Sequence, residues 1–111
     1  MDSLIHDYFA AWNGGDPDAV AAFVTDDVEF EDVTAGHTSH GRDQFRKFVE
    51  ICYDRVPEAQ YEVVDSRLLG DTYWVEWVMH PMGVRGASVG TLRDRRIAAN
   101  RDYWNGAVFQ P

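Results

Sequence analysis

The sequence predicts an α+β fold in which three helices from the N-terminal half pack on a curved antiparallel sheet. Helical spacing of apolar residues is confined to the first 56 positions, and only strand patterns follow, with no helix between them. Such a sheet, covered by helices on one side, would enclose a conical space and form a cone-shaped half-barrel. Because 111 residues correspond to about one domain, we expect residues 1–111 to form a single unit.

The first two helices are predicted to form a helical hairpin. Apolar side chains recur at helical spacing in the first helix, at Leu4, Ile5, Tyr8, Phe9 and Trp12. Asp2 or Ser3 can cap its start, and the Gly14-Gly15 pair ends it. The second helix follows at once, with Asp16 as N-cap and Pro17 at the first helical position, where a missing N–H costs nothing.

The next two elements are a strand and a third helix. The stretch from Val28 to Asp32 alternates as a strand, with Val28, Phe30 and Asp32 on an apolar face and two glutamates on the other. The pleat therefore turns Asp32 inward. After a loop, an apolar stripe at helical spacing predicts a helix over residues 42–56, which ends before Pro57.

Two antiparallel hairpins are predicted for the rest of the chain. The first joins residues 61–69 to 72–79, and the second joins residues 84–92 to 96–104. The third of these four strands carries small residues at Gly86, Ala87, Ser88 and Gly90. They would let the sheet bend sharply or let a ligand approach its backbone.

Large apolar side chains fall on both faces of the strand over residues 72–79. The period of two sends Tyr73, Trp77 and Met79 to one face, and Trp74, Glu76 and His80 to the other. One face must line the interior, and the pattern leaves open which. Helices cover only one side of the sheet, so the other side would expose an unusually large apolar patch. We therefore expect a homodimer formed through the sheet.

Composition excludes several classes of function. The chain has 10 basic and 19 acidic side chains and a formal charge of −9, which repels nucleic acid and anionic membranes. Its single cysteine, Cys52, excludes an internal disulfide framework, and we interpret it as a small buried hydrophobe. No targeting or membrane-spanning pattern is visible, so a cytoplasmic location is expected.

Asp32 and Asp102 are the candidate acid–base residues. A carboxyl group in an apolar cavity has its pKa raised by desolvation, which suits it to remove a proton next to a carbonyl. If both groups open into one cavity, their repulsion would hold one protonated and provide an acid and a base together. The structural alternative is that Asp32 caps the loop after it, while Asp102 pairs with Arg85 or Arg101.

Tyr8 is the third candidate catalytic residue, because it lies on the buried stripe of the first helix. Its hydroxyl group could polarise a substrate carbonyl, or it could bond to a backbone carbonyl or a water, as core tyrosines often do. Flat apolar walls suit an apolar, ring-shaped ligand. The candidate substrate-binding residues of this kind are Trp12, Phe30, Trp77 and Trp104. His80 could be a proton carrier at the edge of the pocket, although its position favours a structural or surface role.

The stretches YFAAWNGGDPDAVAAFVTDDVEFED (residues 8–32), HGRDQFRKF and RDYWN resemble the nuclear transport factor 2-like superfamily, and within it the SnoaL-like polyketide cyclases. The chain is also similar to ketosteroid isomerases. That resemblance implies that Tyr8 donates a hydrogen bond to an enolate oxygen and that Asp32 shuttles the proton. It places Ser88 where those isomerases have a protonated aspartate. The resemblance to the cyclases implies that Asp102 is the acid–base of an aldol closure.

Metal ions and cofactors are not expected. His37 and His40 lie three residues apart in a loop and, with Asp32 nearby, could hold zinc or iron, but two histidines and one acid are a weak signal and the pattern favours a solvated loop. The chain has no dinucleotide fingerprint, no phosphate-binding glycine loop and no nucleophile elbow.

The leading hypothesis is a small cofactor-independent enzyme that removes a proton next to a carbonyl of an apolar small molecule and leads to isomerisation or cyclisation. The first alternative is a binding protein that holds a hydrophobic ligand without changing it. The second is a scaffold or dimerisation domain, which would need a filled cone with no cavity.

Overall fold

The computed structural model describes residues 3–109. The elements, in chain order, are α1 (Leu4–Gly14), α2 (Pro17–Ala21), β1 (Val24–Asp32), β2 (His37–His40), α3 (Arg42–Arg55), β3 (Gln60–Leu69), β4 (Thr72–His80), β5 (Val84–Arg93), β6 (Arg96–Trp104) and the short 3-10 helix η1 (Gly106–Phe109). The predicted α+β class and the order of helices and hairpins are confirmed. No helix within residues 3–109 is long and apolar enough to cross a membrane.

Local signals set the ends of the first two helices. Asp16 accepts a hydrogen bond from the backbone N–H of Asp18 at 2.9 Å, and Pro17 opens α2, as predicted. Gly15 follows α1 with φ 80°, a left-handed conformation that favours glycine. Ser3 makes no side-chain capping bond, because its hydroxyl group donates to Asp7 instead, and Asp2 lies outside the described residues.

The sheet is mostly antiparallel, as predicted, with one parallel pair that the sequence did not indicate. The strand order is β2-β1-β6-β5-β4-β3, and β1 runs parallel to β6 while the other neighbours are antiparallel. Two strand segments also differ from the prediction. β1 begins at Val24, four residues before the predicted start of the strand at Val28, and β2 forms in the loop expected after that strand. Both depend on pairing with distant or neighbouring backbone, which local side-chain patterns do not reveal.

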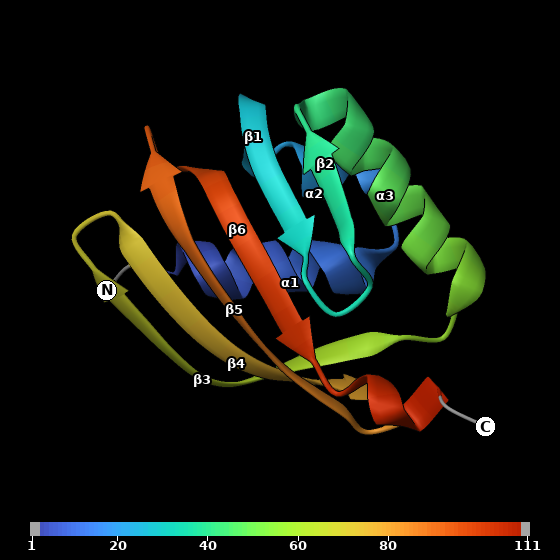
Figure 1. Cartoon of the computed structure of the whole chain (residues 1–111). Helices are drawn as coiled ribbons and strands as arrows, with labels where there is room; N and C mark the ends of the chain where they lie inside the picture. The colour runs from blue at the N-terminus through green and yellow to red at the C-terminus, as the bar shows by residue number, and fades with distance from the viewer. Residues whose placement is uncertain (1–2, 110–111) are drawn as a thin grey trace.

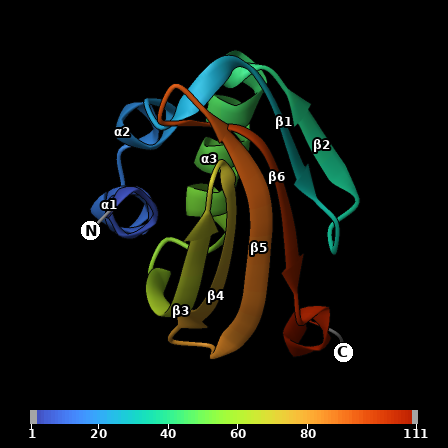
Figure 2. The ribbon, with the colours of Figure 1, turned by 90° about the vertical axis from the view of Figure 1, so that its left-hand side faces the viewer.

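The helices cover one side of the sheet and leave the other side bare (Figure 1). α1 packs on β3, α3 packs on β1 and β2, and α2 packs between α1 and α3. From the side, β5 and β6 curve around the space between the sheet and the helices (Figure 2). This is the predicted half-barrel, and its curved strands form the wall of the interior.

One face of β4 builds the core, and the structure decides which one. Tyr73, Val75, Trp77 and Met79 are buried and face the helices, while Trp74 and Glu76 lie on the outer face. In β1 the same alternation buries Phe30 and Asp32, as predicted.

Two glycines of β5 make room for aromatic side chains of β4. Gly86 pairs with Trp77 across the strands, and Gly90 pairs with Tyr73. A Cβ atom at Gly86 would lie 2.4 Å from the Trp77 ring, and one at Gly90 would lie 2.5 Å from the Tyr73 hydroxyl oxygen. The two glycines therefore serve packing between strands, a reason that the sequence pattern alone did not identify.

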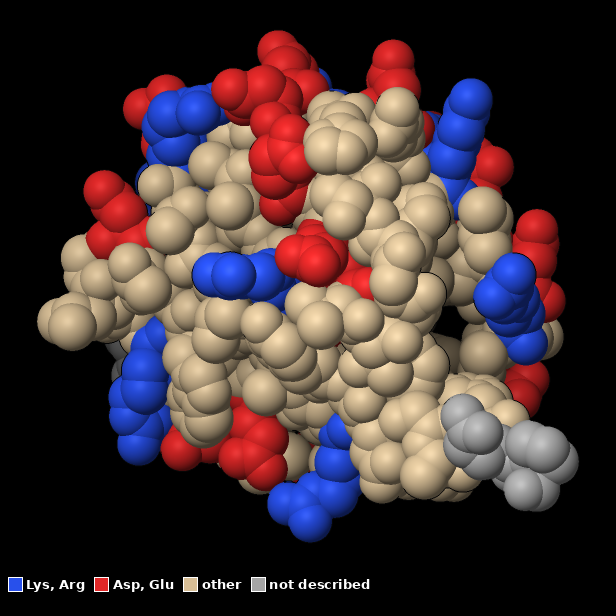
Figure 3. All heavy atoms as spheres, viewed as in Figure 1, with Lys and Arg blue, Asp and Glu red and all other residues tan. Residues whose placement is uncertain are grey.

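The outer face of the sheet mixes apolar and charged side chains. Trp74 and its cross-strand partner Val89 are half-buried there, and Tyr103 is exposed. Glu76 and Arg85 form an ion pair at 3.4 Å on the same face. The space-filling view shows this side as largely neutral surface with scattered acidic and basic groups (Figure 3).

The substitution Gly90→Ala is expected to lower the free energy of unfolding by about 1–3 kcal/mol, because the new methyl group would overpack the core. Its Cβ would also lie 2.3 Å from the carbonyl oxygen of Ala99. Gly14→Ala is the matched control, since nothing lies within 4 Å of a Cβ there and alanine favours helices. Urea unfolding measures both variants. Equal stability of Gly90→Ala and the wild type would contradict this account.

The homodimer stays a prediction. Light scattering at micromolar concentration is expected to give the mass of two chains for the wild type. Trp74→Arg is expected to shift the mass toward one chain, because it adds a charge to the outer face without touching the core. A wild-type mass of a single chain would show the prediction to be wrong.

Candidate active site

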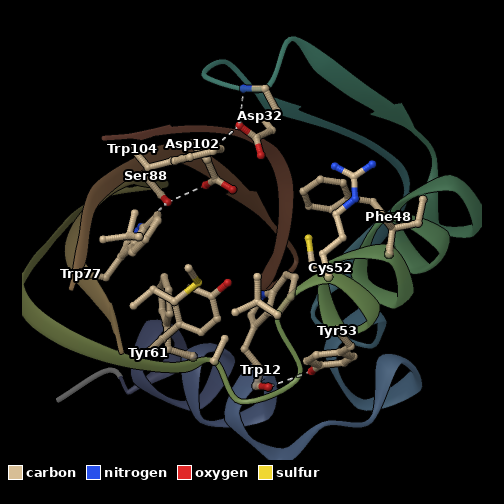
Figure 4. A pocket seen from close by; sticks show the side chains of 18 of the residues that line it. Trp12, Asp32, Phe48, Cys52, Tyr53, Tyr61, Trp77, Ser88, Asp102 and Trp104 are labelled. Carbon is tan, nitrogen blue, oxygen red and sulfur yellow. Dashed lines mark hydrogen bonds between the residues drawn. The ribbon is translucent and has the colours of Figure 1, made fainter. Parts of the chain in front are cut away.

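A cavity of about 460 Å³ lies between the helices and the inner face of the sheet. Most of its wall is apolar, and aromatic side chains come from α1, α3, β3, β4 and β6 (Figure 4). The predicted site residues that line it are Tyr8, Trp12, Asp32, Trp77, Ser88, Asp102 and Trp104. The cone is therefore hollow, and the three candidate catalytic residues converge on the same space.

Asp32 and Asp102 lie at the same level of two neighbouring strands. The parallel register of β1 and β6 makes them direct partners, so both side chains leave the same face of the sheet. Both carboxyl groups are seen on one wall of the cavity in Figure 4. No ion pair to either carboxylate is found within residues 3–109. The predicted alternative of an Asp102 ion pair is wrong for Arg85, which pairs with Glu76 instead.

Asp32 is held by two neutral donors. Its Oδ1 accepts a hydrogen bond from the Trp104 indole N–H at 2.7 Å and one from the backbone N–H of Ala35 at 3.0 Å. The second bond caps the loop after β1, as the structural alternative predicted. The same side chain, 8% exposed, also lines the cavity, so the two roles coexist.

Asp102 is likewise held through one oxygen. Its Oδ1 accepts hydrogen bonds from the Ser88 hydroxyl at 2.5 Å and from the Asn100 amide at 2.7 Å. The Ser88 oxygen in turn accepts from the Trp77 indole N–H at 3.0 Å, and the Asn100 carbonyl oxygen accepts from the Tyr73 hydroxyl. No protein partner for Oδ2 of Asp102 is found in the described part of the chain, so this atom is available to a ligand in the cavity.

Burial raises the pKa of Asp102 to about 6. Desolvation of the carboxylate is the largest cause, and the nearby charge of Asp32 adds to it. The hydrogen bonds from Ser88 and Asn100 act in the opposite direction, because they favour the ionised form. At pH 7 Asp102 is therefore mostly ionised, yet it takes up a proton far more readily than an exposed aspartate does.

Tyr8 remains a neutral hydrogen-bond donor at physiological pH. Burial raises the pKa of its hydroxyl group well above the usual value, and the charge of Asp102 raises it further, while a hydrogen bond with Trp12 opposes the shift. Tyr61 also lines the cavity, and desolvation raises its pKa as well. Both phenols therefore offer protons to a ligand rather than negative charge.

Two of the predicted substrate-binding residues do not line the cavity. Phe30 packs into the core against Phe45, with ring centroids 4.5 Å apart. His80 lies on the outer face and contacts Glu62 at 2.9 Å. The alternation of β4 explains the second case, because Trp77 and His80 are an odd number of residues apart and cannot share a face.

The remaining candidates have structural partners of their own. His37 stacks on Phe48, with ring centroids 5.4 Å apart, and His40 pairs with Glu29 at 2.8 Å. Within residues 3–109, no group of three or more His, Cys, Asp or Glu side chains is placed to hold a metal. Cys52 lines the cavity, and burial raises its pKa to about 12, so it is a neutral thiol there.

Sequence reasoning missed Tyr73 and Asn100 as parts of the site. A signal was present for both. Asn100 lies two residues before Asp102 on β6 and so shares its face, and Tyr73 lies on the same face as Trp77. Finding their bond required the cross-strand register, which depends on the hairpin turns.

The family model described as the SnoaL-like domain matches residues 5–100. The chain belongs to the SnoaL-like family. None of the curated proteins compared with the chain matches it.

Solved structures share the fold of this SnoaL-like chain. A ketosteroid isomerase-like fold from Catenulispora acidiphila, in complex with trimethylamine, is 22% identical with a TM-score of 0.84, over 93% of this chain and 85% of that one. A candidate polyketide cyclase from Sinorhizobium meliloti is 20% identical with a TM-score of 0.82, over 93% of this chain and 95% of that one. An NTF2-like protein from Cytophaga hutchinsonii is 13% identical with a TM-score of 0.79, over 97% of this chain and 92% of that one. At these identities the likeness shows the NTF2-like fold alone.

Asp102→Asn is expected to stabilise the SnoaL-like fold at pH 8 by about 1–3 kcal/mol. The pKa of Asp102 is higher in the folded chain than the usual 3.8, so ionisation costs folding free energy as the pH rises through 6. The amide keeps an acceptor oxygen for Ser88 and Asn100 and removes the buried charge. The gain should therefore vanish below about pH 4.

Urea unfolding between pH 4 and pH 8 measures this difference. Asp71→Asn, at the exposed turn between β3 and β4, is the matched control and should change stability little at any pH. An Asp102→Asn variant that is no more stable than the wild type at pH 8 would argue against a costly buried carboxylate.

Proposed function

We propose that this SnoaL-like protein is an enzyme that moves a proton on an apolar, carbonyl-bearing small molecule, by carboxyl acid–base chemistry. The observation that carries the proposal is Asp102, a carboxyl group with a pKa of about 6 that lines an apolar cavity and has one oxygen without a partner among residues 3–109. A buried base with a pKa close to the working pH is suited to proton transfer from carbon.

Each candidate residue has a role in the proposed reaction. Oδ2 of Asp102 takes a proton from the carbon next to the carbonyl, and the electron pair of the broken C–H bond forms an enolate. The neutral hydroxyl of Tyr8 donates a hydrogen bond to the enolate oxygen. In an isomerase, Asp102 returns the proton to another carbon of the ligand. In a cyclase, the enolate carbon attacks a second carbonyl of the same molecule, and the acid protonates the new alkoxide.

In the proposed reaction, Asp32 raises the pKa of Asp102, and aromatic side chains position the ligand. The charge of Asp32 next to Asp102 favours the protonated form of Asp102, which strengthens that group as a base. The aromatic side chains of Trp12, Trp77 and Trp104 supply flat walls for a ring-shaped ligand. The two carboxyl groups thus divide the work, with Asp102 as the proton carrier.

A binding protein for a hydrophobic ligand is the second candidate function. The observation in its favour is that most of the cavity wall is apolar. Native mass spectrometry would detect a ligand retained through purification, and a ligand returned chemically unchanged would favour this function. The scaffold alternative predicted a filled cone, and the cavity contradicts that expectation.

Proton transfer can be tested before the natural substrate is known. The protein is incubated in D₂O with 2-tetralone, a two-ring ketone with acidic C–H bonds next to its carbonyl, and deuterium uptake is followed by mass spectrometry. The wild type should accelerate exchange, with a rate that rises as the pH passes through about 6, because Asp102 must be ionised to accept a proton. Asp102→Asn should lower the rate by about 10²–10⁴-fold.

Asp71→Asn serves as the matched control and should exchange like the wild type, since its carboxyl group is exposed and far from the cavity wall. Asp32→Asn should lower the rate less than Asp102→Asn does. Exchange that proceeds equally well in Asp102→Asn and in the wild type would rule out the proposed role of Asp102.

A further inference from the structure

The hydrogen bonds that lead to Asp102 all run in one direction. In the first chain of hydrogen bonds, the Trp77 indole donates to Ser88, and Ser88 donates to Oδ1 of Asp102. In the second chain of hydrogen bonds, the Tyr73 hydroxyl donates to Asn100, and the Asn100 amide donates to the same Oδ1. Both chains begin on β4 and end on one oxygen atom on β6.

We propose that Tyr73, Asn100, Trp77 and Ser88 are positioning residues that commit Oδ1 of Asp102 to accepting hydrogen bonds and leave Oδ2 as the atom that carries the proton. The inference rests on the proposed function, in which Asp102 is the base. It adds a division of labour between the two oxygens of one carboxyl group.

The first chain can run only one way. An indole N–H is a donor without acceptor capacity, so the Ser88 oxygen must accept from Trp77. A hydroxyl group has a single hydrogen, and that of Ser88 is directed at Asp102. Oδ1 therefore faces a donor, and a proton on Oδ1 would clash with it.

The second chain fixes the orientation of an amide. The Tyr73 hydroxyl donates to the carbonyl oxygen of Asn100, which turns the NH₂ group toward Asp102. A flipped amide would place the Asn100 carbonyl oxygen against Oδ1 of Asp102, two acceptors in contact. Tyr73 thus acts on Asp102 through Asn100, although it does not touch the carboxyl group.

Burial protects both chains from water. Tyr73, Trp77, Ser88 and Asn100 are between 2% and 6% exposed. In such surroundings the hydrogen bonds are stronger than in water, and a ligand that enters the cavity does not have to compete with them. The rings at which both chains of hydrogen bonds begin also pack closely, because Gly86 and Gly90 leave the space that a Cβ atom would otherwise take from Trp77 and Tyr73.

The hydrogen bonds from Ser88 and Asn100 counteract the effect of burial on the Asp102 pKa. Desolvation and the charge of Asp32 both push Asp102 toward the protonated form, in which it cannot act as a base. Donors to Oδ1 oppose that push without covering Oδ2. The expected result of losing one donor is a carboxyl group that is protonated at a higher pH.

The titration of Asp102 tests this directly, by ¹³C NMR of side-chain carboxyl groups in the full chain, with Asp102→Asn to assign the signal. In Ser88→Ala, and in the double variant Tyr73→Phe/Asn100→Leu, the Asp102 pKa should rise by about one pH unit, because each removes one donor. The double variant replaces both members of a bonded pair by apolar groups of similar shape, which limits the loss of stability.

Two further variants separate positioning from general damage to the fold. Ser88→Thr keeps the hydroxyl group and should keep the wild-type pKa of Asp102. Ile97→Val removes one buried methyl group from β6, the strand that carries Asp102. Ile97 makes no hydrogen bond to Asp102, so this variant should leave the Asp102 pKa unchanged. An unchanged Asp102 pKa in Ser88→Ala, or an equal rise in Ile97→Val, would overturn the inference.

The same variants distinguish this inference from the proposed function. If the Asp102 pKa moves as expected but the wild type does not accelerate deuterium uptake by 2-tetralone, the positioning network stands and the proposed function fails. If uptake is catalysed, its rise with pH should shift upward in Ser88→Ala together with the NMR titration. If the wild type catalyses deuterium uptake but neither its pH dependence nor the NMR titration of Asp102 shifts in Ser88→Ala, the positioning role is contradicted and the proposed function stands.

Discussion

The parallel pairing of β1 with β6 is the contact on which the site depends. It joins the end of the first strand to the end of the last one and sets Asp32 and Asp102 side by side. The helices on the inner face leave Asp32 only 8% exposed and Asp102 half-buried. Within residues 3–109, neutral donors hold both groups and no cation neutralises them. The chain therefore carries two carboxyl groups on a mostly apolar cavity, an arrangement that costs stability.

The cost is met by packing elsewhere in the cone. The core around the cavity is rich in large, fully buried side chains, including Phe30, Phe45 and Tyr73. Aromatic pairs such as Trp12 with Tyr61, at 5.6 Å between ring centroids, join α1 to β3. The polar tips of Tyr73 and Trp77 serve the site while their rings serve the core. The core and the candidate site thus share side chains.

Much of the fold follows from the sequence because its signals are local. The Asp16-Pro17 start of α2, Gly15 after α1 and the alternation of β4 depend on neighbours within a few residues. The parallel pairing of β1 with β6 depends on contacts between distant segments, and β2 depends on pairing with the strand just before it; neither was predicted. For the site, the inward turn of Asp32 was predictable from the pleat. The partners of Asp102 were not, because cross-strand register decides that Ser88 and Asp102 face each other.

The close contacts of Gly86 and Gly90 have a consequence for how this sequence can change. Each glycine shares one volume with an aromatic ring on the adjacent strand, Trp77 or Tyr73. A larger residue at Gly86 would have to displace the Trp77 ring, whereas one at Gly90 would meet both the Tyr73 ring and the backbone carbonyl oxygen of Ala99. Variation of this wall is therefore least costly at Gly86 when Trp77 is exchanged for a smaller residue at the same time, whereas Gly90 is also constrained by the backbone of β6.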